Sequence, residues 1–145
     1  MAEKNTAQNF DWIWMPHAGH FILSYKCRFF LNTYVNGYVI STVGELWNER
    51  AVREICAEVR DPIWFSENRS LKGDAFDSAY FKKFGFEDIG YNRKYETIVF
   101  KAKKSNEVCC PYEIDVDKEF EMDGYNNAKD AREGHMALCK KYSKK

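Results

Sequence analysis

The sequence has no excess of charge of either sign and no long apolar run. Its 22 basic and 22 acidic side chains cancel, whereas a protein held mainly by phosphate groups needs a basic surplus. No apolar stretch approaches the roughly 18 residues that a membrane-spanning helix requires. Residues 1–9 are polar and lack the basic start and apolar stretch of a signal peptide. We therefore expect a cytoplasmic protein that does not enter a membrane.

Signatures of common enzymes are also missing. The chain contains no phosphate-binding glycine loop, no Gly-x-Ser-x-Gly elbow and no His-Glu-x-x-His motif. Only three histidines occur, His17, His20 and His135. The pair His17 and His20 is suited to metal binding or to proton transfer near neutral pH. The competing interpretation is a turn after Pro16. A small enzyme using His17 or His20 is therefore kept as an alternative.

What the sequence does contain is aromatic residues, which make up 17% of the chain. A disordered chain has few of them, and 145 residues suit a single domain. We divide the chain into a polar tail (1–9), an aromatic-rich core (10–104) and a C-terminal segment (105–145) packed on the same domain. A set of large apolar residues near the N-terminus is expected to close the core, with an exposed binding arm as the alternative: Phe10, Trp12, Trp14 and Met15.

Asn36-Gly37 is the clearest local signal. It separates two segments, 28–35 and 38–43, that are rich in β-branched and aromatic residues. Asn and Gly tolerate positive φ, so this pattern predicts a hairpin with a two-residue type I′ turn. The implied register places Val35 opposite Tyr38 and Thr33 opposite Ile40. Apolar residues on both faces of the hairpin predict that both are at least partly covered.

The remaining pattern predicts further strands and helices. Helical spacing appears around 52–59, with Asn48 as the candidate cap and a strand as the alternative, and over 75–84 with Asp74 as cap and Gly85 as terminator. Asp61-Pro62 is expected to end the first of these helices, because a residue before proline disfavours helix. Residues 61–73 are then expected to form a loop and 95–102 a strand. A last helix is expected to begin at a capping Asn127 and to run to about residue 142. These elements predict an α+β fold, a small antiparallel sheet with two or three helices.

The five cysteines suggest a metal site. The number is odd, and a reducing cytoplasm favours metal binding over a disulfide framework. His135 and Cys139 are four residues apart on the last predicted helix and so share one face. Together with Cys109 and Cys110 they would complete the four-ligand Cys3His shell of a structural zinc ion. The alternative is that Cys139 belongs to a core stripe and that His135 is a hydrogen-bonded surface residue.

Several stretches resemble a family of small proteins that is associated with phage genomes and metagenomes. The resemblance covers most of residues 28–142, and the similar stretches are Thr33-Tyr34-Val35, Ser41-Thr42-Val43-Gly44-Glu45, Val52-Arg53-Glu54-Ile55, Lys94-Tyr95-Glu96-Thr97-Ile98-Val99-Phe100, Gly124-Tyr125-Asn126 and Gly134-His135-Met136-Ala137-Leu138-Cys139. The family pattern places closely spaced cysteines before a final histidine–cysteine pair, although Cys109 and Cys110 are adjacent here. The resemblance therefore favours zinc, and it implies no enzymatic activity.

The function that we expect is binding. The preferred interpretation is a protein-interaction module with a structural zinc ion, a phage accessory protein with a host protein as its partner. The alternative is a nucleic-acid-binding module, because cations interleaved with aromatic rings can hold a single strand. That alternative depends on one set of residues: Lys82, Lys83, Arg93, Lys94, Lys101, Lys103 and Lys104, beside Tyr91 and Tyr95.

Overall fold

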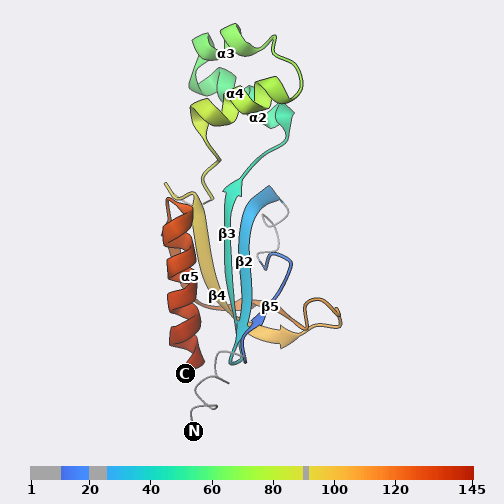
Figure 1. Ribbon diagram of the computed structural model, residues 1–145, viewed down its shortest axis with the longest axis vertical. Coiled ribbons are helices and arrows are strands. Elements are labelled where there is room, and N and C mark those ends of the chain that lie inside the picture. Colours follow the sequence, from blue (N-terminus) through green and yellow to red (C-terminus); the bar gives the residue numbers. More distant parts are fainter. Residues whose placement is uncertain (1–10, 20–25, 90–91) are drawn as a thin grey trace. The chain divides into compact units, whose positions relative to one another are not determined.

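The computed structural model describes residues 11–19, 26–89 and 92–145 (Figure 1). The chain forms two compact units, a sheet unit made of Met1–Leu46 and Asp88–Lys145 and a helical unit made of Trp47–Glu87. Within the described residues there are five strands and four helices, which confirms the α+β prediction. The C-terminal segment, 105–145, supplies the last strand and the last helix of the sheet unit.

The sheet unit is built on one antiparallel sheet whose strands follow each other in chain order. Each strand pairs antiparallel with the next along the chain, and the chain between β3 and β4 contains the helical unit. The strands are β1 (Ile13–Trp14), β2 (Cys27–Val35), β3 (Tyr38–Leu46), β4 (Tyr95–Lys104) and β5 (Tyr112–Tyr125).

The hairpin of β2 and β3 confirms the prediction made from Asn36-Gly37. Both turn residues have positive φ, 49° at Asn36 and 88° at Gly37. The pairs Val35–Tyr38 and Thr33–Ile40 are those that a two-residue turn requires. The register assigns alternate residues of each strand to opposite faces, and both faces carry buried side chains.

One face of the sheet is covered by helix α5 (Ala128–Ser143), as Figure 1 shows. The helix begins where the sequence predicts it, because the Asn127 side chain accepts a hydrogen bond from the Asp130 N–H at 2.8 Å. Its buried side chains pack against the sheet and form a cluster with Val35, Ile40 and Val99. Gly134 lets the helix approach the Tyr125 ring, since a Cβ there would lie 2.2 Å from the Tyr125 hydroxyl oxygen.

The opposite face of the sheet carries a second cluster of buried side chains. Its buried members are Met15, Val39, Phe100 and Ile114. Val39 and Phe100 are direct cross-strand partners, one position away from the residues that face α5. The two clusters therefore lie on different faces, and the second packs against residues of the 105–111 loop.

The helical unit contains α2 (Arg50–Arg60), α3 (Pro62–Asn68) and α4 (Asp74–Phe84). Its buried centre is formed by Ala57 of α2 and by Phe76 and Tyr80 of α4. Helical spacing around 52–59 and the aromatic face of 75–84 are thus confirmed. Gly85 ends α4 with φ of 72°, as predicted.

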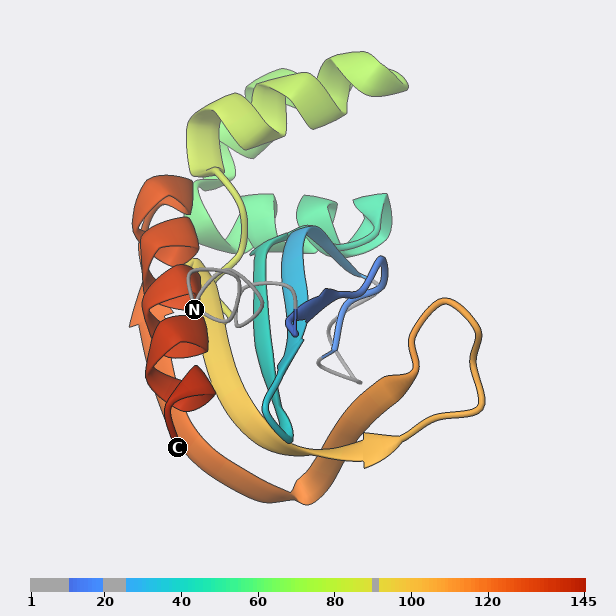
Figure 2. The same cartoon turned by 60° about the horizontal axis from the view of Figure 1, so that its bottom comes forward.

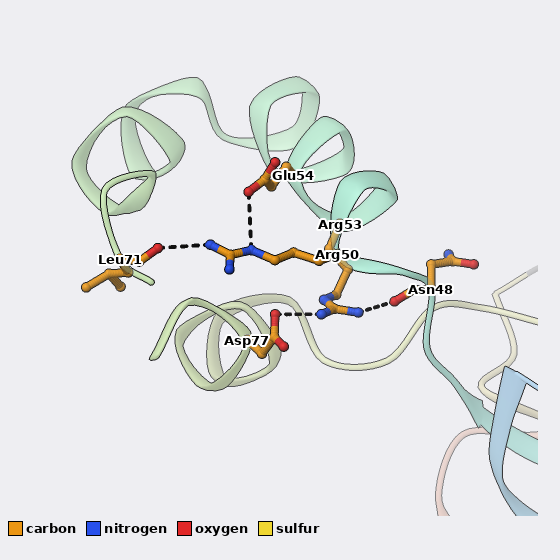
Figure 3. A network of polar contacts seen from close by, with 6 residues as sticks. All are labelled: Asn48, Arg50, Arg53, Glu54, Leu71 and Asp77. Atoms are coloured by element: carbon orange, nitrogen blue, oxygen red, sulfur yellow. Dashed lines mark hydrogen bonds and ion pairs between the residues drawn. The ribbon is translucent and has the colours of Figure 1, made fainter. Parts of the chain in front are cut away.

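Two arginines of α2 connect the segments of the helical unit (Figure 3). The guanidinium of Arg53 is buried and donates to Asp77 at 2.5 Å and to the carbonyl of Asn48. Arg50 donates to the carbonyl of Leu71 at 2.9 Å and pairs with Glu54. The buried cation of Arg53 thus has both an anion and a carbonyl partner, as burial of charge requires.

Three local predictions in this region were wrong. Residues 61–73 do not form a loop throughout, because α3 occupies most of the first part. Asp74 does not cap α4: the N-cap is Gly73, and no side-chain cap bond is formed. Asn48 is likewise not the cap of α2, whose N-cap is Glu49. In α3 the cap is Asp61, whose carboxylate accepts from the Trp64 N–H at 3.0 Å.

Candidate metal centre

The segment after β1 brings His17 onto the sheet face opposite α5. The Met15 N–H donates to the Asn32 carbonyl at 2.7 Å, and the Asn32 side-chain amide donates to the His17 carbonyl at 2.8 Å. Gly19 lies directly on the sheet, because a Cβ there would be only 2.7 Å from the Ser41 hydroxyl oxygen. These contacts hold the backbone on both sides of His17.

The loop that joins β4 to β5, residues 105–111, brings two thiols to the same face. It starts after the last β4–β5 pair, Lys104–Tyr112, and is closed by a bond from the Ser105 N–H to the Pro111 carbonyl at 2.9 Å. Cys110 is half-buried against the second cluster, whereas Cys109 is exposed. The hairpin formed by β4 and β5 thus fixes both ends of the cysteine pair.

His17, Cys109 and Cys110 meet in one group. The Nδ1 atom of His17 lies 3.5 Å from the sulfur of Cys109 and 3.5 Å from the sulfur of Cys110. Tetrahedral zinc with bonds of about 2.3 Å to sulfur and about 2.0–2.1 Å to nitrogen places these atoms about 3.6 Å apart. In the described part of the chain, this is the one set of three or more histidine, cysteine, aspartate or glutamate residues whose possible ligand atoms all lie within 4.8 Å of one another.

The charge state of the cysteine pair depends on what it binds. Burial and the neighbouring thiol of Cys109 raise the pKa of Cys110 above its ordinary value. Without a cation, Cys110 is therefore held as a neutral thiol. A metal ion binds the thiolate, so its binding displaces a proton from each cysteine. Proton release makes metal affinity at such a pair dependent on pH.

A cavity of about 540 Å³ lies beside this group. Its wall contains His17, both cysteines, Glu107 and the buried amide of Asn32. The carbonyl oxygen of the Asn32 side chain is buried and has no hydrogen-bond partner. The cavity thus offers an unused acceptor next to the thiols and the imidazole.

The structure places the other two predicted zinc ligands elsewhere. His135 and Cys139 face β2 and β3 from α5, on the face of the sheet opposite to the Cys110 cluster. Cys109, Cys110, His135 and Cys139 do not form one group among the described residues. Adjacent positions of a strand point to opposite faces, so the sheet separates the two pairs.

His135 is completely buried and both of its ring nitrogens are occupied. Nε2 lies 2.8 Å from the hydroxyl of Thr33, and Nδ1 lies 2.7 Å from the hydroxyl of Thr42. Burial lowers the pKa of His135 to about 4, which keeps the imidazole neutral at pH 7. Burial also raises the pKa of Cys139 to about 12. His135 and Cys139 are therefore part of the buried interior of the sheet unit.

The sequence pointed to His17 and to the two cysteines as separate candidates, but not to their meeting. His17 was singled out for its spacing from His20, which lies outside the described residues. Cys27, near it in the sequence, is half-buried and is not a member of the group, and burial raises its pKa to about 11. His17 is 92 positions from Cys109. The order of the strands in the sheet brings His17 and Cys109 together. The spacing of residues along the sequence cannot predict such a contact.

Three residues of the nucleic-acid alternative have partners within the sheet unit. Lys94 pairs with Asp88 at 2.8 Å and Lys103 with Glu113 at 3.4 Å, both in the sheet unit. Tyr95 is buried and donates its hydroxyl hydrogen to Glu45. The buried ring of Tyr95 is not accessible for stacking on a nucleic-acid base. Tyr91 lies outside the described residues, and the alternative stays a prediction.

Comparison with known proteins identifies no relative. No family model, no curated protein and no solved structure matches this chain. None of the helices in the described part of the chain is long and apolar enough to cross a membrane. The fold and the site together define an α+β protein with a candidate metal centre of one histidine and two adjacent cysteines.

Proposed function

We propose that this protein is a zinc-binding interaction module whose ion is held by His17, Cys109 and Cys110. The observation that carries the proposal is the pair of 3.5 Å separations between one imidazole nitrogen and two sulfurs. These separations correspond to the edges of a tetrahedral zinc shell. The proposal keeps the two cysteines expected from the sequence and replaces His135 and Cys139 by His17.

The ligand set favours zinc on chemical grounds. Thiolates and imidazole together suit zinc, whereas magnesium and calcium prefer oxygen ligands. Three ligands leave one of the four positions of the shell for water or for a further group. The ion would join the 105–111 loop to the segment after β1, which no disulfide does, since all five cysteines are free.

We assign the module to the cytoplasm, where reduced thiols remain available to a metal. Its activity in this proposal is the binding of a partner protein, a host protein if the association with phages holds. The ion has a structural role, because it fixes the 105–111 loop that connects β4 to β5. This role requires no reaction at the metal.

Metal analysis of the purified protein tests the proposal. We expect about one zinc ion per chain, and loss of zinc in His17→Ala and Cys110→Ser. The matched controls are Cys27→Ser and Cys139→Ser, which change thiols outside the group and are expected to leave the zinc content unchanged. Zinc that is retained in His17→Ala but lost in Cys139→Ser would contradict the proposal and support the ligand set expected from the sequence.

A further inference from the structure

Helix α2 carries an apolar stripe that is exposed to solvent. Val52, Ile55 and Val59 follow the three- and four-residue spacing that places side chains on one face of a helix. Val52 is 40% exposed, Ile55 is 63% exposed and Val59 is 76% exposed. An amphipathic helix of a folded protein ordinarily buries its apolar face. In α2 the buried residues are instead Arg53 and Ala57, so the apolar face is the one left outside.

The face of α2 opposite the stripe is the one that holds the helical unit together. Ala57 packs against the aromatic residues of α4, which lies along one side of α2 in Figure 2. Arg53 donates to Asp77 of α4 at 2.5 Å (Figure 3). Arg53 and Ala57 lie two residues before and after Ile55, and two residues span slightly more than half a helical turn. The buried centre of the unit therefore leaves the stripe uncovered.

The unpaired charge beside the stripe is negative. Glu49 is three residues before Val52 and Glu58 is three residues after Ile55, so one glutamate borders each side of the stripe. Both glutamates are exposed, and neither forms an ion pair within the described residues. The three arginines of α2 are all engaged inside the helical unit, and their pairs are Arg50–Glu54, Arg53–Asp77 and Arg60–Glu87. The arginines therefore do not offset Glu49 and Glu58.

We propose that the stripe of Val52, Ile55 and Val59 binds an amphipathic helix of a partner protein that carries lysine or arginine beside its own apolar face. Apolar side chains at helical spacing in the partner would pack on the stripe. The basic side chains beside them would lie close to Glu49 and Glu58. None of the proposed zinc ligands belongs to this surface, so the inference goes beyond the zinc proposal and does not depend on it.

Charge and area favour this partner over a second copy of the chain. Both sides of the stripe carry an unpaired glutamate, so any symmetric pairing of two stripes brings acidic sides together. A stable dimer buries about 800 Å² on each partner. Helix α2 has 11 residues and is about 16 Å long, and its three exposed apolar side chains supply only a fraction of that area. A small contact of this kind suits transient recognition of a helix.

The test uses a fluorescent 14-residue peptide of seven leucines and seven lysines, with the leucines at helical spacing, and fluorescence anisotropy as the readout. We expect saturable binding that weakens as salt increases. The double variant Ile55→Gln/Val59→Gln is expected to lower affinity at least about tenfold, because it removes the apolar contact. The matched control is Val116→Gln/Met122→Gln, which changes two exposed apolar side chains of β5 and is expected to bind like the unchanged protein.

A second pair of variants tests the charge. Glu58→Lys is expected to lower affinity about threefold or more, because an attractive contact with lysine becomes repulsive. Asp117→Lys makes the same charge change on an exposed residue of β5 and is expected to leave the affinity unchanged. An unchanged affinity in Glu58→Lys would contradict the basic partner.

Two further peptides separate helix recognition from simple attraction. A peptide of the same composition with leucine and lysine in strict alternation cannot form one apolar helix face, and a peptide with glutamate in place of lysine reverses the charge. Both are expected to bind at least about tenfold more weakly. Hydrogen exchange should show added protection of residues 50–60 with the first peptide alone. Equal binding of all three peptides would overturn the proposal.

Stability and self-association provide the remaining outcomes. Ile55→Gln/Val59→Gln should keep the midpoint of chemical denaturation, because both side chains are already exposed. A clear loss of stability in this variant would show that the stripe is covered within the chain itself and would overturn the proposal. An unchanged affinity for the first peptide would do the same. Self-association of the unchanged protein that this variant abolishes would assign the stripe to a second copy and would also overturn it.

Discussion

The neutral imidazole of His135 joins three elements of the sheet unit, since it bonds Thr33 of β2 and Thr42 of β3 from its position on α5. The hydroxyl of Thr42 in turn contacts that of Thr97 on β4 at 2.5 Å. The Trp14 ring lies beside the imidazole, with 5.4 Å between centroids. Every hydrogen-bonding atom of the imidazole is used, which a buried polar group requires if it is to stabilise the fold.

This burial predicts a pH dependence of stability. The pKa of His135 is about 4 in the folded protein and 6.5 in the unfolded chain. The unfolded chain therefore binds the proton more readily. Its contribution to the free energy of unfolding is therefore present above pH 6.5 and is lost as the pH falls toward 4. The loss amounts to about 3 kcal/mol when complete. Urea denaturation between pH 7.5 and 5 measures the part of this loss that occurs above pH 5.

The matched variants for this measurement are His135→Leu and His17→Ala. We expect His135→Leu to be less stable at pH 7.5, because Thr33 and Thr42 lose a partner, and to lose most of the pH dependence above pH 5. His17→Ala should keep it, since His17 is not buried in the interior. An unchanged slope in His135→Leu would show that another group is responsible.

At the scale of elements, the clearest departure from the sequence prediction is α3. Asp61-Pro62 was interpreted as a break, because a residue before proline is disfavoured in a helix. The same pair also favours a helix start, with aspartate as the N-cap and proline at the first helical position. Both effects operate here: α2 ends at Arg60, and α3 begins at Pro62. The local pattern is thus compatible with a loop and with a second helix, and packing of Trp64 and Phe65 on the buried centre favours the helix.

The two aspartates provide a paired test of these caps. Asp61→Ala is expected to reduce the free energy of unfolding by about 0.5–2 kcal/mol, because the Trp64 N–H loses its acceptor. Asp74→Ala should change it by much less, since Asp74 makes no cap bond. Chemical denaturation of the two variants makes the comparison. Asp61→Asn is the control, because asparagine keeps the cap but removes the ion pair with Lys83. Equal losses for both alanine variants would contradict the assignment.

At the scale of the whole molecule, local signals and long-range contacts were not equally predictable. The β2–β3 register and the Asn127 cap follow from residues that are neighbours in the sequence, and both were predicted. The candidate site depends on contacts between His17 and residues more than 90 positions away. Helical spacing correctly placed His135 and Cys139 on one helix face, but it could not show that this face lies on the other side of the sheet from Cys110.

The position of the site leads to a prediction about metal removal. The ion would be bound by the segment after β1 and the 105–111 loop, whereas α5 is attached to the sheet through His135 and its apolar cluster. Because metal-binding energy is local folding energy, a chelator should first increase hydrogen exchange in residues 11–19 and 105–111. Residues of α5 should keep their protection at the same chelator concentration. The His17→Ala protein, without chelator, should show the same pattern. Faster exchange in α5 before the loop would indicate that the metal is bound by His135 and Cys139 after all.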